Sequence, residues 1–183
     1  EAFDLADFTA TNAHYNDALL QLPKVDDPSL WFQLLPGSGY LGLRALEPLL
    51  TRYASGAIAA AGDTYLSLRA VALGLRGGVA LWHGELDAAR VSLDEAASLA
   101  AWTNYTINVC FYTLNPLAWC LALQGDIDAA YRVIDDAIAH TNASDGKPSG
   151  STWYFHWIGL RCALIADRDD LAQQSITRIR ETM

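Results

Sequence analysis

The chain has 183 residues and a mass of 19.9 kDa, and 52% of its residues are hydrophobic against 18% charged. This composition excludes a disordered or collagen-like polymer, and no apolar run approaches the ~18 residues that a membrane-spanning helix needs. With 12 Lys and Arg against 21 Asp and Glu, the net charge of -9 argues against binding to a nucleic-acid backbone or an anionic membrane surface.

The N-terminal third of the chain is irregular, and residues 1–62 predict degenerate N-terminal helices. Apolar residues recur at helical spacing over residues 5–22 and indicate one amphipathic helix. A turn at residues 23–28 and a break rich in Pro and Gly at residues 36–39 follow. A further helix is expected over residues 41–61.

Three helical hairpins are predicted after this region, at residues 63–101, 105–140 and 152–182. Their apolar residues recur every three or four positions, and no long stretch alternates as a half-buried strand would. The segment 141–151 is polar and rich in Gly, Pro and Ser, which predicts an exposed connector loop. We therefore expect an all-α chain that forms one continuous domain over residues 1–183.

The turn inside each predicted hairpin repeats along the chain. The segment GELDAAR, which begins at Gly84, returns 41 residues later as GDIDAAY at Gly125. A weaker third copy begins at Asp167, a further 42 residues on, and lacks the glycine. Glycine can take the left-handed dihedrals that end a helix, an acidic residue is expected to cap the next helix, and small alanines allow close packing. The repetition predicts antiparallel hairpins stacked as a right-handed solenoid, in which equivalent side chains point the same way.

These repeats resemble the tetratricopeptide family, with matches at its turn glycine, its small first-helix position, its two second-helix alanines and its large apolar position. The first copy matches with Gly77, Gly84, Ala89, Leu93 and Ala96. The second copy matches with Ala118, Gly125, Ala130, Ile134 and Ala137, and the third keeps Ala172 and Ile176. The period exceeds the usual ~34 residues and no copy carries the family's terminal proline, so the family's peptide-carboxylate clamp is not assumed. The resemblance implies a tetratricopeptide-like solenoid.

Long repeats rich in alanine and arginine also resemble the helical sensor region of large bacterial signal-transduction ATPases related to the maltose regulator, which end in a LuxR-type DNA-binding domain. The resemblance covers roughly residues 60–183. It implies a cytoplasmic, non-enzymatic sensor module of a bacterial transcriptional regulator. In such proteins the repeats bind an inducer or a partner protein, while other domains bind ATP and DNA.

Aromatic residues crowd the first helices of the hairpins. If the repeat alignment holds, seven side chains face one concave groove: Trp82, Tyr112, Asn115, Trp119, Tyr154, Trp157 and Arg161. We expect the rings to stack on a flat or apolar ligand, the amide to orient it and the guanidinium to hold an anionic group; an extended peptide is the other occupant. Alternatively, the rings are core between repeats and Arg161 pairs with a neighbouring acid.

No catalytic or metal-binding motif is present, so the sequence predicts no enzyme, no cofactor and no metal site. Cys110, Cys120 and Cys162 lie in apolar surroundings without CxxC spacing, which predicts reduced, buried thiols of a cytosolic protein. Two rival functions stay open: a purely structural protein–protein interaction scaffold, and an enzyme built on a titratable pair such as His156 with Asp167. The expected partner is a small-molecule effector or a protein segment, with homo-oligomerisation left open.

Overall fold

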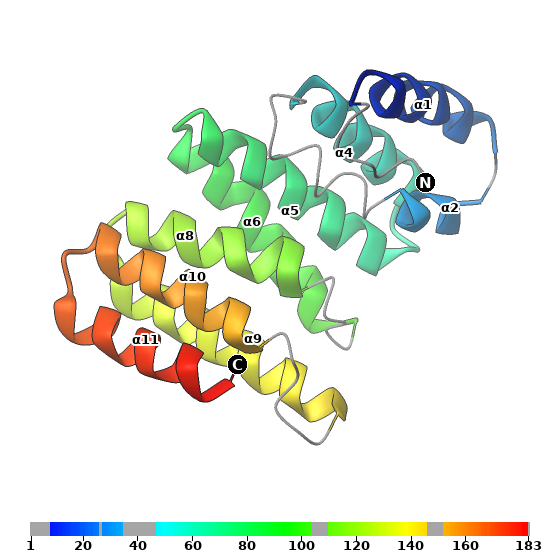
Figure 1. Cartoon of the computed structure of the whole chain (residues 1–183). Coiled ribbons are helices and arrows are strands. Elements are labelled where there is room, and N and C mark those ends of the chain that lie inside the picture. The colour runs from blue at the N-terminus through cyan, green and yellow to red at the C-terminus, as the bar shows by residue number, and fades with distance from the viewer. Residues whose placement is uncertain (1–7, 26, 35–46, 104–109, 146–151, 183) are drawn as a thin grey trace.

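The computed structural model describes residues 8–25, 27–34, 47–103, 110–145 and 152–182. Every regular element in these ranges is helical, which confirms the all-α prediction for them (Figure 1). The elements are α1 (Phe8–Gln21), the 3-10 turn η1 (Leu22–Lys24), α2 (Ser29–Gln33), α4 (Glu47–Ala61), α5 (Leu66–Trp82), α6 (Leu86–Ala101), the π-helical turn η2 (Cys110–Leu114), α8 (Asn115–Leu123), α9 (Ile127–Asp145), α10 (Thr152–Ile165) and α11 (Asp169–Thr182). None of these helices is both long and apolar enough to span a bilayer.

The predicted connector 141–151 is wrong in its first half, because α9 continues through Asp145. Thr141 is buried, and its hydroxyl donates a hydrogen bond to the carbonyl of Ala137 one turn earlier. This bond satisfies the hydroxyl inside the helix, a use of threonine that a composition argument for a loop does not anticipate. The rest of the connector and residues 35–46, where part of the helix predicted over 41–61 falls, lie outside the described residues.

The three hairpin turns share one backbone geometry. Left-handed dihedrals occur at Gly84, Gly125 and Asp167, with φ of 74°, 87° and 53°. In each turn the next residue donates its N–H to the carbonyl five positions earlier, at N···O distances of 2.9, 2.9 and 3.0 Å. This is the hydrogen bond of a Schellman helix end. The third copy therefore makes the same turn as the other two although it lacks their glycine.

The prediction that an acidic residue caps the second helix is confirmed for the second hairpin and wrong for the first. The carboxylate of Asp126 accepts the N–H of Ala129 at 3.0 Å and so caps α9. Glu85, at the equivalent position before α6, makes no side-chain cap bond. Aspartate is a preferred capping residue, whereas the glutamate side chain is one methylene longer and does not return to the helix start in this way.

Each of α8 and α10 packs on both helices of the hairpin before it: α8 on α5 and α6, and α10 on α8 and α9. The hairpins consequently follow one another across the molecule in chain order (Figure 1). Two glycines of α5 allow close approach. A Cβ on Gly77 would lie 2.5 Å from Cγ of Leu93 in α6, and a Cβ on Gly74 would lie 2.1 Å from the carbonyl oxygen of Tyr112 in η2.

Two buried clusters form the core, and α5 contributes to both. In the N-terminal cluster Trp31 packs edge-on against Tyr53, with ring centroids 5.7 Å apart, and the Tyr53 hydroxyl donates to the Trp31 carbonyl at 2.7 Å. The C-terminal cluster holds all three cysteines, which are free and buried, as the sequence predicted: Cys110, Cys120 and Cys162.

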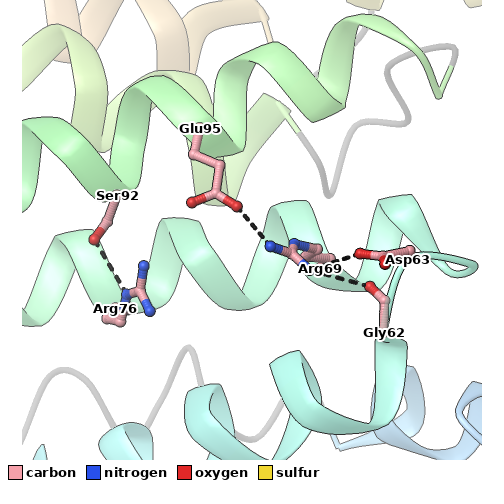
Figure 2. A network of polar contacts seen from close by, with 6 residues as sticks. All are labelled: Gly62, Asp63, Arg69, Arg76, Ser92 and Glu95. Carbon is pink, nitrogen blue, oxygen red and sulfur yellow. Dashed lines mark hydrogen bonds and ion pairs between the residues drawn. The ribbon is translucent and has the colours of Figure 1, made fainter.

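A polar network fixes α5 against its neighbours (Figure 2). The guanidinium of Arg69 contacts the carboxylate of Glu95 in α6 at 2.9 Å and that of Asp63, in the turn after α4, at 3.3 Å. Further along α5, Nε of Arg76 donates to Oγ of Ser92 at 3.1 Å. The first hairpin is therefore held by paired charges and hydrogen bonds as well as by apolar packing.

Candidate ligand-binding wall

The shared turns allow residues of α5, η2–α8 and α10 to be aligned by position, and together these residues form a set, partly buried, that we call the wall. Residues are assigned to one row when they lie the same number of positions before Gly84, Gly125 and Asp167. The wall consists of four rows: Val71, Tyr112 and Tyr154; Gly74, Asn115 and Trp157; Gly78, Trp119 and Arg161; and Trp82, Leu123 and Ile165. All seven residues predicted from the sequence belong to these rows.

The middle element of the wall changes its helical period. Residues 110–114 form the π-helical η2, and α8 continues from Asn115 with Pro116 in its first turn. Pro116 has no N–H to donate to the carbonyl of Tyr112 four positions earlier, and that carbonyl lies against Gly74 of α5. Single π-turns of this kind occur frequently at functional sites. The wider turn rotates residues 111–115 away from the positions that a continuous α-helix would give them.

The aromatic rings of the wall contact one another. Phe111 stacks on Tyr154 with centroids 4.6 Å apart, and Tyr154 stacks on Trp157 at 5.8 Å. Tyr112 meets Phe111 edge-on at 5.2 Å. Burial raises the pKa of Tyr154, and the positive charge of Arg161 partly offsets this rise. The rings that were expected to stack on a ligand therefore stack first on each other.

Arg161 lies between two indole rings. Its Cζ is 4.2 Å from the ring centroid of Trp119 on α8 and 4.9 Å from that of Trp157 on its own helix. Both distances are within the range of cation–π attraction. The guanidinium makes no hydrogen bond or ion pair with any residue that the structure describes, so the alternative in which Arg161 pairs with a neighbouring acid is wrong for these residues.

Asn115 carries a buried amide without a partner. The residue is 5% exposed, and neither Nδ2 nor Oδ1 has a hydrogen-bond partner in the part of the chain that the structure describes. The buried Nε1 of Trp119 also lacks an acceptor within the same ranges. Asn115 and Trp119 are four residues apart on α8, so their side chains are neighbours on one helix face, and Arg161 covers that same indole. Since about nine in ten buried polar groups are paired, these three side chains form an unusual concentration of unmet hydrogen bonding.

Trp82 lies apart from this cluster. It is 48% exposed and makes no ring contact among the described residues. It shares the fourth row with Leu123 and Ile165, which are also exposed. The structure therefore brings together six of the seven predicted residues, and Trp82 contributes to an apolar edge of the wall instead.

The seven residues predicted from the sequence do not include Phe111 or Gly78. Phe111 lies beside the first row of the wall and stacks on Tyr154, and by position it corresponds to Trp153 in the third hairpin. Gly78 is the equivalent of Trp119 and Arg161, and a Cβ built on it meets no atom within 4 Å. The sequence signal for Phe111 is that its counterpart Trp153 is also aromatic, whereas the open space at Gly78 depends on the folded structure.

The structure does not bring together the titratable pair of the enzyme alternative. His156 lines a pocket of about 490 Å³ between α9, α10 and α11, together with Asp135, Arg178 and Glu181, but not with Asp167. Burial lowers the pKa of His156, Arg178 lowers it further, and the two carboxylates oppose this shift. No group of three potential metal ligands gathers anywhere in the described ranges.

Comparison of the chain with protein-family models, with curated proteins and with solved structures found no match.

Proposed function

We propose that this chain is a non-enzymatic sensor module that binds a small-molecule effector at the wall. The observation that carries the proposal is the buried amide of Asn115, which has both polar atoms unpaired. An unpaired buried polar group costs ~1–3 kcal/mol, and an apolar side chain would avoid this loss at a position that served packing alone. A ligand that pairs with the amide recovers the lost hydrogen bonds.

The proposal includes a tetratricopeptide-like right-handed solenoid with the wall on its concave side. Two observations support this arrangement: the same turn occurs three times, and α8 and α10 each pack on both helices of the hairpin before them. A ligand held between α8 and α10 would favour one spacing of adjacent hairpins, and thereby one curvature of the stack. A place within a cytoplasmic bacterial transcriptional regulator rests on the sequence resemblance and stays a prediction.

A purely structural scaffold is the second candidate, and the ring contacts favour it. Phe111, Tyr154 and Trp157 stack on one another across two hairpins, as core residues between repeats would. In a scaffold the amide of Asn115 would be a packing defect. The two candidates therefore differ in whether the unpaired groups acquire a partner in solution.

A ligand screen against a single substitution separates the two candidates. Thermal shift with a library of small metabolites and short peptides would be measured on the wild type, on Asn115→Leu and on Ser92→Ala. Ser92 is a matched control because it is buried and polar but paired with Arg76, outside the wall. A sensor predicts compounds that stabilise the wild type and Ser92→Ala but have little effect on Asn115→Leu. If each compound shifts the melting temperatures of the three proteins by the same amount, the scaffold is favoured.

A further inference from the structure

Arg161 differs from the other half-buried arginines in lacking a counter-ion. Among the described residues, Arg69, Arg90 and Arg161 are the arginines of intermediate exposure. Arg69 contacts two carboxylates (Figure 2), and Arg90 contacts the carboxylate of Asp94 at 2.7 Å. Arg161 has only the two indole faces. Removing a charge from water is unfavourable unless it is paired, so this guanidinium is the one whose environment favours an added anion.

The free groups around Arg161 are mainly hydrogen-bond donors. The guanidinium lies over two indole rings and makes no hydrogen bond or ion pair within the described residues, so its N–H groups are unpaired there, and the Trp119 indole and the Asn115 amide carry further unpaired N–H donors. Oδ1 of Asn115 is the single unpaired acceptor among them. No position in the four rows of the wall is acidic, although the chain as a whole has a net charge of -9. The wall therefore suits a ligand that is rich in acceptors and negatively charged.

Gly78 leaves open space on α5. It is the equivalent of Trp119 and Arg161 in the first hairpin, and no atom lies within 4 Å of where its Cβ would be. The third row thus holds an open position on α5, an indole on α8 and a cation on α10, and α8 packs on both of the other two helices. A ligand with a charged end and an apolar body fits this order.

We propose that the effector is a small organic oxyanion, a carboxylate or a phosphate, whose charged group binds the N–H edge of Arg161. Its apolar body lies toward Gly78, and a hydroxyl or N–H group of the ligand donates to Oδ1 of Asn115. The planar guanidinium can bind two oxygens of such a group at once, which a lysine cannot do. This inference rests on the proposed function of the wall and specifies its ligand.

Three small probes test the charge requirement: benzoate, its neutral isostere benzamide, and phenyl phosphate. Tryptophan fluorescence and thermal shift would follow each titration, because two indoles flank Arg161. We expect at least one of the two acids to bind saturably and benzamide to bind about tenfold more weakly or worse. Whichever of benzoate and phenyl phosphate binds more tightly identifies the charged group of the ligand as a carboxylate or a phosphate.

Substitutions locate the binding. Arg161→Gln should abolish binding of the acid, and Arg161→Lys should weaken it because lysine lacks the planar fork. Arg132→Gln, which changes an exposed arginine of α9, is the matched control and should bind like the wild type. Circular dichroism would check the fold of each variant, and the lysine variant decides the outcome if the glutamine variant is unfolded.

Several outcomes would overturn the inference. Equal binding of benzamide and benzoate, acid binding that survives Arg161→Gln or is unchanged by Arg161→Lys, or no binding of either acid at tens of millimolar would each exclude an oxyanion at Arg161. None of these results contradicts a ligand-binding wall by itself, since the comparison of wild type with Asn115→Leu against the wider library tests that separately. If the oxyanion probes do not bind at Arg161 and the wider library does not distinguish Asn115→Leu from the wild type, the structural scaffold is the remaining candidate function.

Discussion

Asn115 combines deep burial with two unpaired polar atoms, and this combination makes its effect on stability testable. Asn115→Leu replaces the amide by an apolar group with the same branching of heavy atoms, so the free energy of unfolding should rise by ~1–2 kcal/mol. Urea denaturation followed by circular dichroism measures the change. Asn115→Asp, which introduces a buried charge, should destabilise the protein instead. A leucine variant less stable than the wild type would show that the amide is paired in solution.

Adjacent glycines of α5 should respond to alanine in opposite directions. Gly77→Ala places a Cβ 2.5 Å from Cγ of the fully buried Leu93, and such overpacking should lower the free energy of unfolding by ~1–3 kcal/mol. Gly78→Ala meets nothing within 4 Å and should raise it by ~0.5–1 kcal/mol through helix propensity. Thermal denaturation of the two variants gives the comparison. Equal shifts would mean that α5 and α6 do not approach as closely as the structure shows.

At the scale of the element, the third hairpin turn is the strained one. Asp167 takes φ of 53°, where Gly84 and Gly125 take 74° and 87°. Asp167→Gly should therefore raise the free energy of unfolding by ~0.5–1 kcal/mol, while Gly125→Ala should lower it by ~1–2 kcal/mol. Chemical denaturation of both variants measures the pair. A stabilising Gly125→Ala would contradict the left-handed turn.

The turns and helix faces could be predicted from sequence because local interactions decide them. Gly84 and Gly125 permit one backbone geometry, and the hydrogen bonds of that geometry lie within a few residues. The helical continuation at Thr141 could not be predicted from composition, because a buried threonine can satisfy its hydroxyl on a carbonyl of its own helix, as Thr141 does on Ala137. Composition describes that residue only as polar.

The positions of the candidate wall follow from counting along the sequence, but the contacts between its side chains could not be predicted. Register along the hairpins identified Asn115 and Arg161 as facing residues. Sequence could not show that Tyr154 stacks on Phe111, because that contact joins α10 to the π-helical η2, whose changed period alters the direction of its side chains. It also could not show that Arg161 has no carboxylate partner among the described residues, since this depends on every element that packs around it.

At the scale of the whole molecule, the three thiols report on a single buried region. Burial is the largest influence on each, and it raises the pKa of Cys110 to about 11 and that of Cys162 to about 12. A reagent that reacts with cysteine thiolates should therefore, at pH 8, modify the native protein far more slowly than the unfolded protein.

The urea dependence of this reaction should follow the loss of helical circular dichroism, because α5 contributes to both core clusters and couples them. The control is a sample unfolded in concentrated urea, in which all three thiols should react promptly. Thiol labelling that precedes the loss of helix would indicate that the C-terminal cluster opens on its own.

The shared turns also bear on how a chain of this kind can change its length during evolution. Each hairpin presents its successor with the same pair of helices, as the packing of α8 on α5 and α6 and of α10 on α8 and α9 shows. Gain or loss of a complete unit of 41 or 42 residues preserves that junction. A shorter insertion inside a helix instead rotates the side chains on one side of the insertion relative to those on the other, so that they no longer match the rows of the wall. Duplication of whole hairpins would therefore extend the wall by one residue in each row, and the reach of the binding surface would grow in steps.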